Sequence, residues 1–331
     1  MEQQKLLKTL FLWPSQNIAR MIPLILISGF IAGLFVDTSG LKQYILPVTV
    51  LMIYPTMIGF KTREIVSFSH GKLLLTAVIL NFLIVPGVAW LLGTGFLLGD
   101  PQLFAGLAIT SLLPTSNMTI AFTMLAKGNV PGAVKLTTLS LILGAIVAPW
   151  YLLAMVGKYV PVDVIQTLKT ILIVILLPLL MGIGTYTLLL KRYTQEQFQK
   201  NIKPLLPAAS AWGMIFIIFT SISMNADRIA SHLDIFAFAL LVQVVFYAIN
   251  YILAVSVGRV LFKQTDSLAL VFATVLRNLS ISIGLAATAF GPNAALMVSL
   301  AFLIQQQAAA WFIRLNERYH LLEKSRSLSE V

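Results

Sequence analysis

The feature that most constrains this chain is a series of apolar segments, each long enough to cross a lipid bilayer. A spanning helix needs roughly 20 mostly apolar residues. Ten such segments cover residues 17–36, 44–60, 72–98, 102–126, 131–157, 164–190, 204–223, 233–262, 267–290 and 293–315. Hydrocarbon offers no water to backbone amides, so long continuous apolar segments cross it as helices. The sequence therefore predicts an all-α polytopic membrane protein with about ten transmembrane helices.

Composition excludes several classes of protein. The chain is 58% hydrophobic and 11% charged, whereas soluble domains are about 25% charged. It has no cysteine, which rules out disulfides, thiolate metal sites and thiol catalysis. All three histidines (His70, His232 and His320) lie outside the apolar segments, and no phosphate-binding loop is present. We therefore expect no enzymatic activity, no metal site, no cofactor and no ATP-driven pumping by this chain alone.

The distribution of basic residues predicts the orientation in the membrane. With the N-terminus inside, 16 Lys and Arg residues fall on inner segments and span ends, against only Lys42, Lys158, Lys169 and Arg228 outside. Cytoplasmic loops carry the excess of Lys and Arg, so both termini are predicted to be cytoplasmic, in a cell inner (plasma) membrane. The N-terminal segment lacks the small-residue cleavage site of a secretory signal. The net charge of +11 thus fits anionic lipid headgroups as partners, and nucleic acid is not expected.

Ten segments divide into two sets of five. The join would lie in the short outer segment 158–163, giving a first repeat at 1–157 and a second at 158–331. With an odd number of spans in each half, the second repeat is inverted relative to the first.

The fourth segment contains a break in the middle of a span. Residues 112–129 read LLPTSNMTIAFTMLAKGN, so Pro114, Thr115, Ser116, Asn117 and Thr119 interrupt an apolar run. Proline removes a backbone donor and disturbs the preceding turn. Taken alone, this pattern also fits a proline kink stabilised by neighbouring hydroxyls.

The ninth segment carries a matching break, which favours a functional role. Residues 275–293 read VLRNLSISIGLAATAFGPN, and a shift of 163 residues pairs Asn117 with Ser280, Thr119 with Ser282 and Gly128 with Gly291. Interrupted helices at corresponding places in two halves point to a transport site. Their free backbone ends can hold ions or anionic groups.

Two cations lie inside predicted spans. Arg277 lies deep in the ninth segment, and Lys135 about one turn into the fifth, whereas all 12 Asp and Glu residues lie in tails, loops or span ends. An intramembrane cation normally faces a cavity or a partner. Arg277 is either a counter-charge for an anionic substrate or a clamp on the loose carbonyls of the break, and Lys135 either lines the site or snorkels to the inner surface. Asn81 and the run IQQQ at 304–307 are interpreted as helix–helix hydrogen-bonding groups.

Four stretches of this chain resemble the bile acid/sodium symporter and arsenite permease superfamily. They are LMIYPTMIGFKTREI (51–65), ILNFLIVPGVAWLLG (79–93), GLAITSLLPTSNMTIAFTMLAKGN (106–129) and RNLSISIGLAATAFGPNAAL (277–296). The second- and third-span motifs are closer to the arsenical-resistance branch. The resemblance implies a core domain from 72–157 and 233–315, in which broken helices four and nine cross, and a panel from 17–60 and 164–223. Substrate would bind between core and panel, and their relative movement would give alternating access.

The sequence departs from both branches of that superfamily where their ligands lie. Arsenite permeases carry a cysteine where this chain has Thr115 and a glutamate where it has Ser280. A hydroxyl does not suit arsenic(III) as a thiolate does. The bile-acid branch carries a Glu-x-x-x-Gln-Asn run for sodium. Aligned on Asn278, its glutamine falls on Arg277 and its glutamate on Ala273. A fixed cation thus replaces a sodium ligand, which argues against sodium coupling.

The leading interpretation is a secondary transporter of a small anion or oxyanion. The residues expected to bind the substrate are Arg277, Asn278, Thr115, Ser116, Asn117, Thr119, Ser280, Ser282 and Lys135, with Pro114 at the helix break. An arsenite or metalloid efflux permease with altered ligands is the alternative within transport. A membrane receptor or scaffold that has lost transport is the alternative of another class. The expected partners are a small anionic solute and the bilayer, and the expected assembly is a monomer or homodimer.

Overall fold

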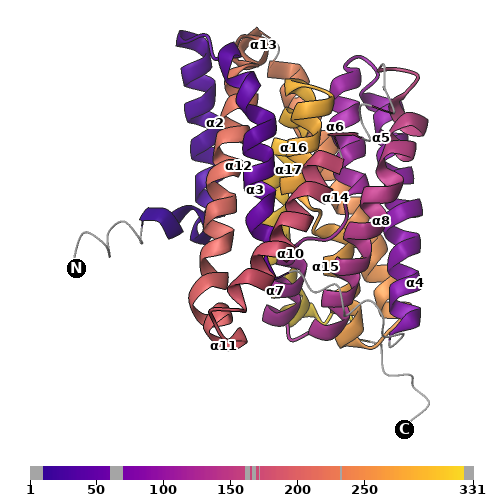
Figure 1. Ribbon diagram of the computed structural model, residues 1–331. Helices are drawn as coiled ribbons and strands as arrows, with labels where there is room; N and C mark the ends of the chain where they lie inside the picture. Colours follow the sequence, from indigo (N-terminus) through magenta and orange to yellow (C-terminus); the bar gives the residue numbers. More distant parts are fainter. Residues whose placement is uncertain are drawn as a thin grey trace.

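The part of the chain that the structure describes is mostly helical (Figure 1). The computed structural model describes residues 10–59, 70–160, 165, 169–170, 172–231 and 233–323, and it contains no strand within them. The chain ends, at 1–9 and 324–331, lie outside the described residues. The predicted cytoplasmic location of the termini therefore stays a prediction.

The first half contains long helices interrupted at two places. Its helices are α2 (Ile18–Phe35), α3 (Ile45–Met57), α4 (Gly71–Ile79), α5 (Val85–Phe96), α6 (Pro101–Leu112), α7 (Asn117–Leu125) and α8 (Val130–Val156). A π-helical turn, η3 (Leu80–Ile84), joins α4 to α5 without ending the span, whereas four residues out of helix separate α6 from α7.

The second half follows a similar order. After the π turn η4 (Leu172–Leu176) come α10 (Leu177–Leu189), the short α11 (Gln195–Gln197), α12 (Leu206–Ser223), α13 (Ala226–Ser231), α14 (Leu233–Leu261), α15 (Gln264–Val275), α16 (Leu279–Ala289) and α17 (Pro292–Tyr319). A break of three residues separates α15 from α16, and a 28-residue helix follows, as the 27-residue α8 follows α7.

The described helices fit a polytopic membrane protein, which confirms the all-α fold class. Seven are long and apolar enough to cross a bilayer, or eight if the bent segment Leu10–Gln16 with Arg20–Phe35 is counted. Two predicted spans are shorter as helices: α3 has 13 residues, and the fourth span is divided into α6 and α7. The count of ten crossings and the inverted repeat stay predictions.

Proline in the first turn starts three of the helices around the breaks. Pro101 begins α6, Pro131 lies in the first turn of α8, and Pro292 begins α17. The first residues of a helix have no intrahelical partner for their N–H, so proline costs little there, and its fixed φ favours the helix. Asp100 and Asn129 cap α6 and α8 by accepting from Leu103 and Gly132 N–H, at 3.4 and 2.8 Å.

The helices pack as two groups. In the first, which we name the α12 group, α12 packs against α2 and α3, and α3 packs against α10. In the second, the crossing group, α6 packs on α5, α8 and α17, α15 on α7, α8 and α14, and α16 on α17. Figure 1 shows α2, α12 and α3 side by side on one flank and α5, α8 and α4 on the other. The groups meet where α16 packs against α3 and α12, and α17 against α12 and α2.

Close helix contacts depend on small residues, as is usual in membranes. A Cβ built on Gly106 of α6 would lie 2.4 Å from the carbonyl oxygen of Ala294 in α17, and one on Gly33 of α2 would lie 2.1 Å from that of Ser223 in α12. Neither position accepts a larger residue without a shift of backbone.

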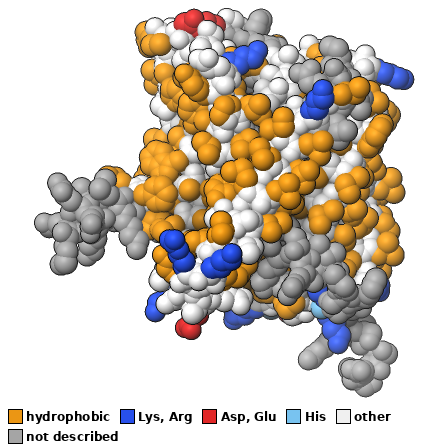
Figure 2. All heavy atoms as spheres, viewed as in Figure 1, with side chains coloured by type: hydrophobic (Ala, Val, Ile, Leu, Met, Phe, Trp, Pro, Cys, Tyr) orange, Lys and Arg blue, Asp and Glu red, His pale blue; other side chains and the backbone are white. Residues whose placement is uncertain are grey.

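The outer surface is largely apolar. In Figure 2 hydrophobic side chains cover the middle of the visible face, and Lys and Arg lie near its two ends. Among the most exposed are Phe35, Leu51, Trp150 and Ile252, between 61 and 82% exposed. A surface of this kind is stable in contact with lipid tails.

Candidate functional site

The two helix breaks meet inside the crossing group. The backbone N–H of Asn278, in the second break, donates to the carbonyl oxygen of Leu113, in the first, at 2.8 Å. The hydroxyl of Thr119 lies 3.4 Å from the carbonyl oxygen of Phe272, near the end of α15. The ends of α6 and α15 and the starts of α7 and α16 therefore converge on one point.

The local sequence explains how the first break is held. Pro114 follows the end of α6, and Thr115 adopts φ +60°, which is unusual for a β-branched residue and costs of order 1–3 kcal/mol. Ser116 then restarts the helix as a capping box: its hydroxyl accepts from Met118 N–H, and its own N–H donates to the Thr119 hydroxyl, both at 3.2 Å.

The turns that follow the two breaks are tied to the crossing group as well. Asn129, after α7, donates from its backbone N–H to the Thr265 carbonyl oxygen at 2.9 Å and from its side-chain amide to Asp266 at 2.6 Å. Gly291, after α16, has φ +94° and lies beside Gln102 at the start of α6. Each turn thus contacts the first turn of the broken span in the other half.

Arg277 binds the loose carbonyl groups of both breaks. Its side chain is 1% exposed. Nε donates to the Thr110 carbonyl oxygen at 3.2 Å, Nη1 donates to the Thr274 carbonyl oxygen at 2.9 Å, and Nη2 donates to the Ser111 carbonyl oxygen. These carbonyls belong to the last turns of α6 and α15, where the C=O groups have no intrahelical hydrogen-bond donor. The guanidinium therefore holds the two C-terminal helix ends together.

Three side chains from other helices fix the position of Arg277. Asn81, in the π turn η3, accepts from Nη1 at 2.6 Å and donates to the Ala273 carbonyl oxygen at 3.2 Å. Gln305 of α17 accepts from the Arg277 N–H at 2.7 Å and donates to its carbonyl oxygen at 3.1 Å. Tyr247 of α14 donates to the same Gln305 oxygen at 2.8 Å. Three helical elements, η3, α14 and α17, thus contribute to holding one residue.

The charges at the crossing do not cancel through an acidic side chain. The ion pair of His320 with Glu323 lies after α17, and Asn81, the side chain that bonds the Arg277 guanidinium among the described residues, is neutral. A helix carries about half a positive charge at its N-terminus and half a negative charge at its C-terminus. Arg277 binds the negative ends of α6 and α15, whereas the positive ends of α7 and α16 are capped by the neutral side chains of Ser116 and Asn278.

Ser282 is the expected site residue whose buried hydroxyl has no hydrogen-bond partner among the described residues. It lies in the first turn of α16, is fully buried, and its hydroxyl makes no hydrogen bond within the described chain. On α12, which packs against α16, the buried hydroxyls of Thr220 and Ser221 also have no hydrogen-bond partner among the described residues. Buried polar atoms are normally paired, so unpaired ones call for a ligand, a water or a change of conformation.

The remaining expected residues lie in the two breaks or on α7, α8 and α16. Thr115 is buried, with its hydroxyl 3.4 Å from the Thr137 carbonyl oxygen, and Asn278 caps α16 by accepting from Ile281 N–H at 3.3 Å. Ser280 is half-buried, and Lys135 of α8 is 9% exposed. The side chain of Asn117 lies outside the described residues. Whether any of these residues binds substrate stays a prediction.

Sequence reasoning treated the partners of Arg277 as ordinary hydrogen-bonding groups. Asn81 and the Gln run at 304–307 were recognised as polar side chains in apolar helices, but the run does not show that Gln305 is the member facing Arg277. Tyr247 gave no signal, because a tyrosine in an apolar helix looks like a packing residue. The carbonyls of Thr110, Ser111 and Thr274 are main-chain groups, which no residue type reveals.

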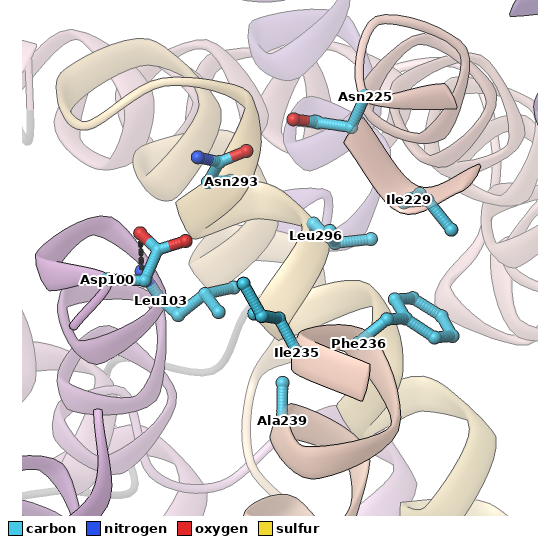
Figure 3. A pocket seen from close by; sticks show the side chains of 9 residues that line it. All are labelled: Asp100, Leu103, Asn225, Ile229, Ile235, Phe236, Ala239, Asn293 and Leu296. Carbon is cyan, nitrogen blue, oxygen red and sulfur yellow. Dashed lines mark hydrogen bonds between the residues drawn. The ribbon is translucent and has the colours of Figure 1, made fainter. Parts of the chain in front are cut away.

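A small pocket lined by three polar and six apolar side chains lies where the two helix groups meet, at the end of the molecule that bears α13. Its volume is about 20 Å³, and Figure 3 shows the carboxylate of Asp100 and the amides of Asn225 and Asn293 around it. A neighbouring cavity of about 370 Å³, lined by Asp100, Asp234, Phe96 and Phe238 among others, lies between α14 and the segment joining α5 to α6. Neither is lined by Arg277 or by any other residue of the two helix breaks, so these pockets are separate from the candidate site.

Comparison with known proteins identifies the family. The model of the sodium bile acid symporter family matches residues 46–232. Over 262 residues the chain is 25% identical to the uncharacterized protein YbaS of Bacillus subtilis, covering 77% of this chain and 82% of that protein.

Two further relatives are matched over about half their length. They are the uncharacterized sodium-dependent transporter YocS of B. subtilis (28% identical, 54% of this chain and 53% of that protein) and the probable sodium/metabolite cotransporter BASS3 of Oryza sativa subsp. japonica (26% identical, 66% and 51%). A closer relation to the arsenical-resistance branch stays a prediction. The family match covers more than half of an all-helical, lipid-compatible chain, and the chain therefore belongs to the sodium bile acid symporter family, a family of membrane transporters rather than enzymes.

Proposed function

We propose that this protein is a secondary transporter of a small anion or oxyanion that works without sodium. Transport itself follows from the family. The anionic substrate and the absence of sodium coupling are inferred from the crossing, where a buried guanidinium has no carboxylate partner among the described residues. That single observation carries the proposal.

The arrangement of helix ends favours an anion. Arg277 neutralises the C-terminal ends of α6 and α15 by direct hydrogen bonds. The N-terminal ends of α7 and α16, at Ser116 and Asn278, keep their positive potential, and helix N-termini bind carboxylate, sulfate and phosphate groups readily. We place the substrate's charged group near these two ends, within reach of Ser280 and Ser282 and of the region that holds Thr115, Asn117, Thr119 and Lys135.

Sodium dependence in relatives does not transfer easily to this chain. YocS and BASS3 are named as sodium-dependent or sodium-coupled proteins. A sodium ion about 4 Å from the Arg277 guanidinium would be repelled by about 4 kcal/mol at an effective dielectric constant near 20. Ion binding there would be weakened about a thousandfold. We propose that the fixed charge of Arg277 takes the electrostatic role that a bound sodium ion would otherwise have.

Alternating access would come from movement of the α12 group against the crossing group. The contact of α16 with α3 includes Gly284, where a built Cβ would lie 2.2 Å from the Thr49 methyl group. This close contact between α16 and α3 would have to change if the two groups moved relative to each other. Arg277, Gln305 and Asn278 tie the two broken spans to each other and to α17, so we expect the crossing to move as one body.

The experiment that tests this function measures solute binding by thermal unfolding of the purified full chain. Small carboxylates, sulfonates and inorganic oxyanions are compared with the neutral amides of the same carboxylates, each in sodium and in potassium buffer. At least one anion should raise the unfolding midpoint equally in both buffers, and its amide should not. Uptake into proteoliposomes then shows transport. Stabilisation that requires sodium, or that the amides share, would refute the proposal.

A further inference from the structure

The pocket at the end of the molecule that bears α13 is surrounded by side-chain oxygens from three separate elements. Asn225 lies between α12 and α13, Asp100 directly precedes α6, and Asn293 lies in the first turn of α17. Figure 3 shows the amide oxygens of Asn225 and Asn293 directed toward each other and one carboxylate oxygen of Asp100 turned to the same side. We name this pocket of about 20 Å³ the oxygen recess.

The amide of Asn225 is held so that its oxygen faces the oxygen recess. The residue is 6% exposed, and Nδ2 donates to the Ser221 carbonyl oxygen at 2.7 Å. That bond fixes which end of the amide faces the recess, and Oδ1 makes no hydrogen bond among the described residues. A buried acceptor is normally paired, so this oxygen calls for a donor from outside the chain.

The oxygen recess adjoins the larger cavity of about 370 Å³, since Asp100 and Leu103 line both. The larger cavity has a second carboxylate, on Asp234 near the start of α14, and the rings of Phe96 and Phe238, whose centroids lie 6.1 Å apart. Its volume is in the range of small-molecule sites. Aromatic rings beside carboxylates favour an organic cation as the ligand.

The two spaces fit the two parts of a primary amine. An –NH₃⁺ group has three N–H donors and no acceptor, and the oxygen recess presents acceptor oxygens from three side chains, one of them a carboxylate. The carbon chain of the amine would lie in the larger cavity, beside apolar side chains. A calcium ion takes about six to eight oxygen ligands, usually including several carboxylates, and gains nothing from an apolar cavity.

We propose that the oxygen recess and the larger cavity together form a second ligand site, which binds a primary alkylammonium group. This amine site is separate from the crossing and takes a charge opposite to that of the proposed substrate, so it goes beyond the proposed function. Asn225 follows α12, whereas Asp100 and Asn293 belong to helices of the crossing group, so a bound ammonium would link the two groups. Two sources carry this chemistry, a soluble alkylamine and the headgroup of an ethanolamine lipid.

Thermal unfolding of the purified full chain tests the amine site with butylammonium chloride as the probe. Butanol has the same carbon chain without the charge, and tetramethylammonium has the charge without an N–H donor. We expect a saturable rise of the unfolding midpoint with butylammonium and none with butanol, tetramethylammonium or calcium chloride at equal ionic strength.

Substitutions of single aspartates locate the response. Asp100→Asn removes the charge but keeps the cap of α6, because Asn and Asp cap helices equally well, and it should weaken apparent butylammonium binding about tenfold. Asp234→Asn should weaken it less, because this carboxylate lines only the larger cavity. The matched control is Asp227→Asn on α13, where the side chain is exposed and lines neither space, and it should leave the response unchanged.

Nanodiscs distinguish the two sources of the ammonium group. An ethanolamine lipid acting as the ligand should raise the midpoint above that in phosphatidylcholine, whose headgroup has no N–H donor, and Asp100→Asn should remove this difference. A soluble amine as the ligand should raise the midpoint equally in both lipids.

The amine site is overturned if neither butylammonium nor the ethanolamine lipid stabilises the native chain, or if both aspartate variants respond as the native chain does. Stabilisation by calcium chloride and not by butylammonium would show a metal site instead and would also overturn it. Anion binding in amine-free buffer tests the proposed function separately, so either proposal can fail without the other.

Discussion

Replacing Gln305 by leucine should be among the most destabilising single changes in the chain. The side chain is 3% exposed and makes three hydrogen bonds: it accepts from the Arg277 N–H and the Tyr247 hydroxyl and donates to the Arg277 carbonyl oxygen. Leucine has a similar volume, so little cavity forms. What changes is that three buried polar groups lose their partner at once.

The expected magnitude follows from those three groups. Each buried donor or acceptor left without a partner costs about 1–3 kcal/mol, so Gln305→Leu should lower the free energy of unfolding by at least about 3 kcal/mol. The matched control is Gln307→Leu, two residues along the same helix, where the side chain is exposed and makes no hydrogen bond among the described residues. That change should be close to neutral.

Unfolding of the purified variants in detergent measures the difference, and a second substitution tests its cause. Tyr247→Phe alone should destabilise the protein because it leaves the Gln305 oxygen with one donor fewer. In the Gln305→Leu background the same change should cost less, since it then removes an unpaired hydroxyl. Equal stability of Gln305→Leu and Gln307→Leu, or strict additivity with Tyr247→Phe, would refute the hydrogen-bond network as the reason.

Three further predictions concern helix packing, orientation in the membrane and substrate. Gly284→Ala should destabilise the packing of α16 on α3, because the new Cβ would meet the Thr49 methyl group at 2.2 Å; adding Thr49→Ser, which removes that methyl, should restore part of the lost stability. A cysteine at Gln195 should react with a membrane-impermeant thiol reagent only from the cytoplasmic side and one at Asp37 only from outside, because of the excess of Lys and Arg on the inner segments; the opposite pattern would reverse the proposed orientation. Expression in an arsenite-sensitive host should give no resistance, since the chain has no thiol for arsenic(III); survival on arsenite would show that hydroxyl or main-chain groups suffice.

Much of the helical framework can be predicted from hydropathy because the bilayer imposes length. The segment predicted at 131–157 is a helix from Val130 to Val156, and the one at 233–262 is a helix from Leu233 to Leu261. The break around Pro114 was visible for a different reason. Proline followed by several small polar residues is incompatible with an uninterrupted apolar helix, and the structure indeed leaves 113–116 out of helix.

Side-chain roles at the crossing were less accessible, because they depend on how each helix is rotated about its axis. Sequence reasoning left Arg277 with two alternatives, a clamp on the break or a counter-charge for an anion. The hydrogen bonds to Thr110, Ser111 and Thr274 show that the guanidinium does bind the loose carbonyls. They do not remove its charge, so the clamp is compatible with the role of counter-charge, and the two have to be separated by substitution.

Arg277→Lys separates geometry from charge. A guanidinium offers five N–H donors in a rigid plane, whereas an ammonium offers three from a single atom. Lysine cannot reach four oxygens that belong to α6, α15 and the π turn, so at least one buried carbonyl should lose its partner, at a cost of about 1–3 kcal/mol. The unfolding midpoint should therefore fall, but less than for Arg277→Met, which leaves all four oxygens without a donor. Anion binding should survive in Arg277→Lys and be lost in Arg277→Met, because only the former keeps the positive charge.

If Arg277→Lys is as stable as the native chain, the rigid geometry of the guanidinium is not what joins the two breaks. If it is destabilised and also fails to bind anions, the positive charge alone does not attract the solute, and the counter-charge role proposed for Arg277 is wrong.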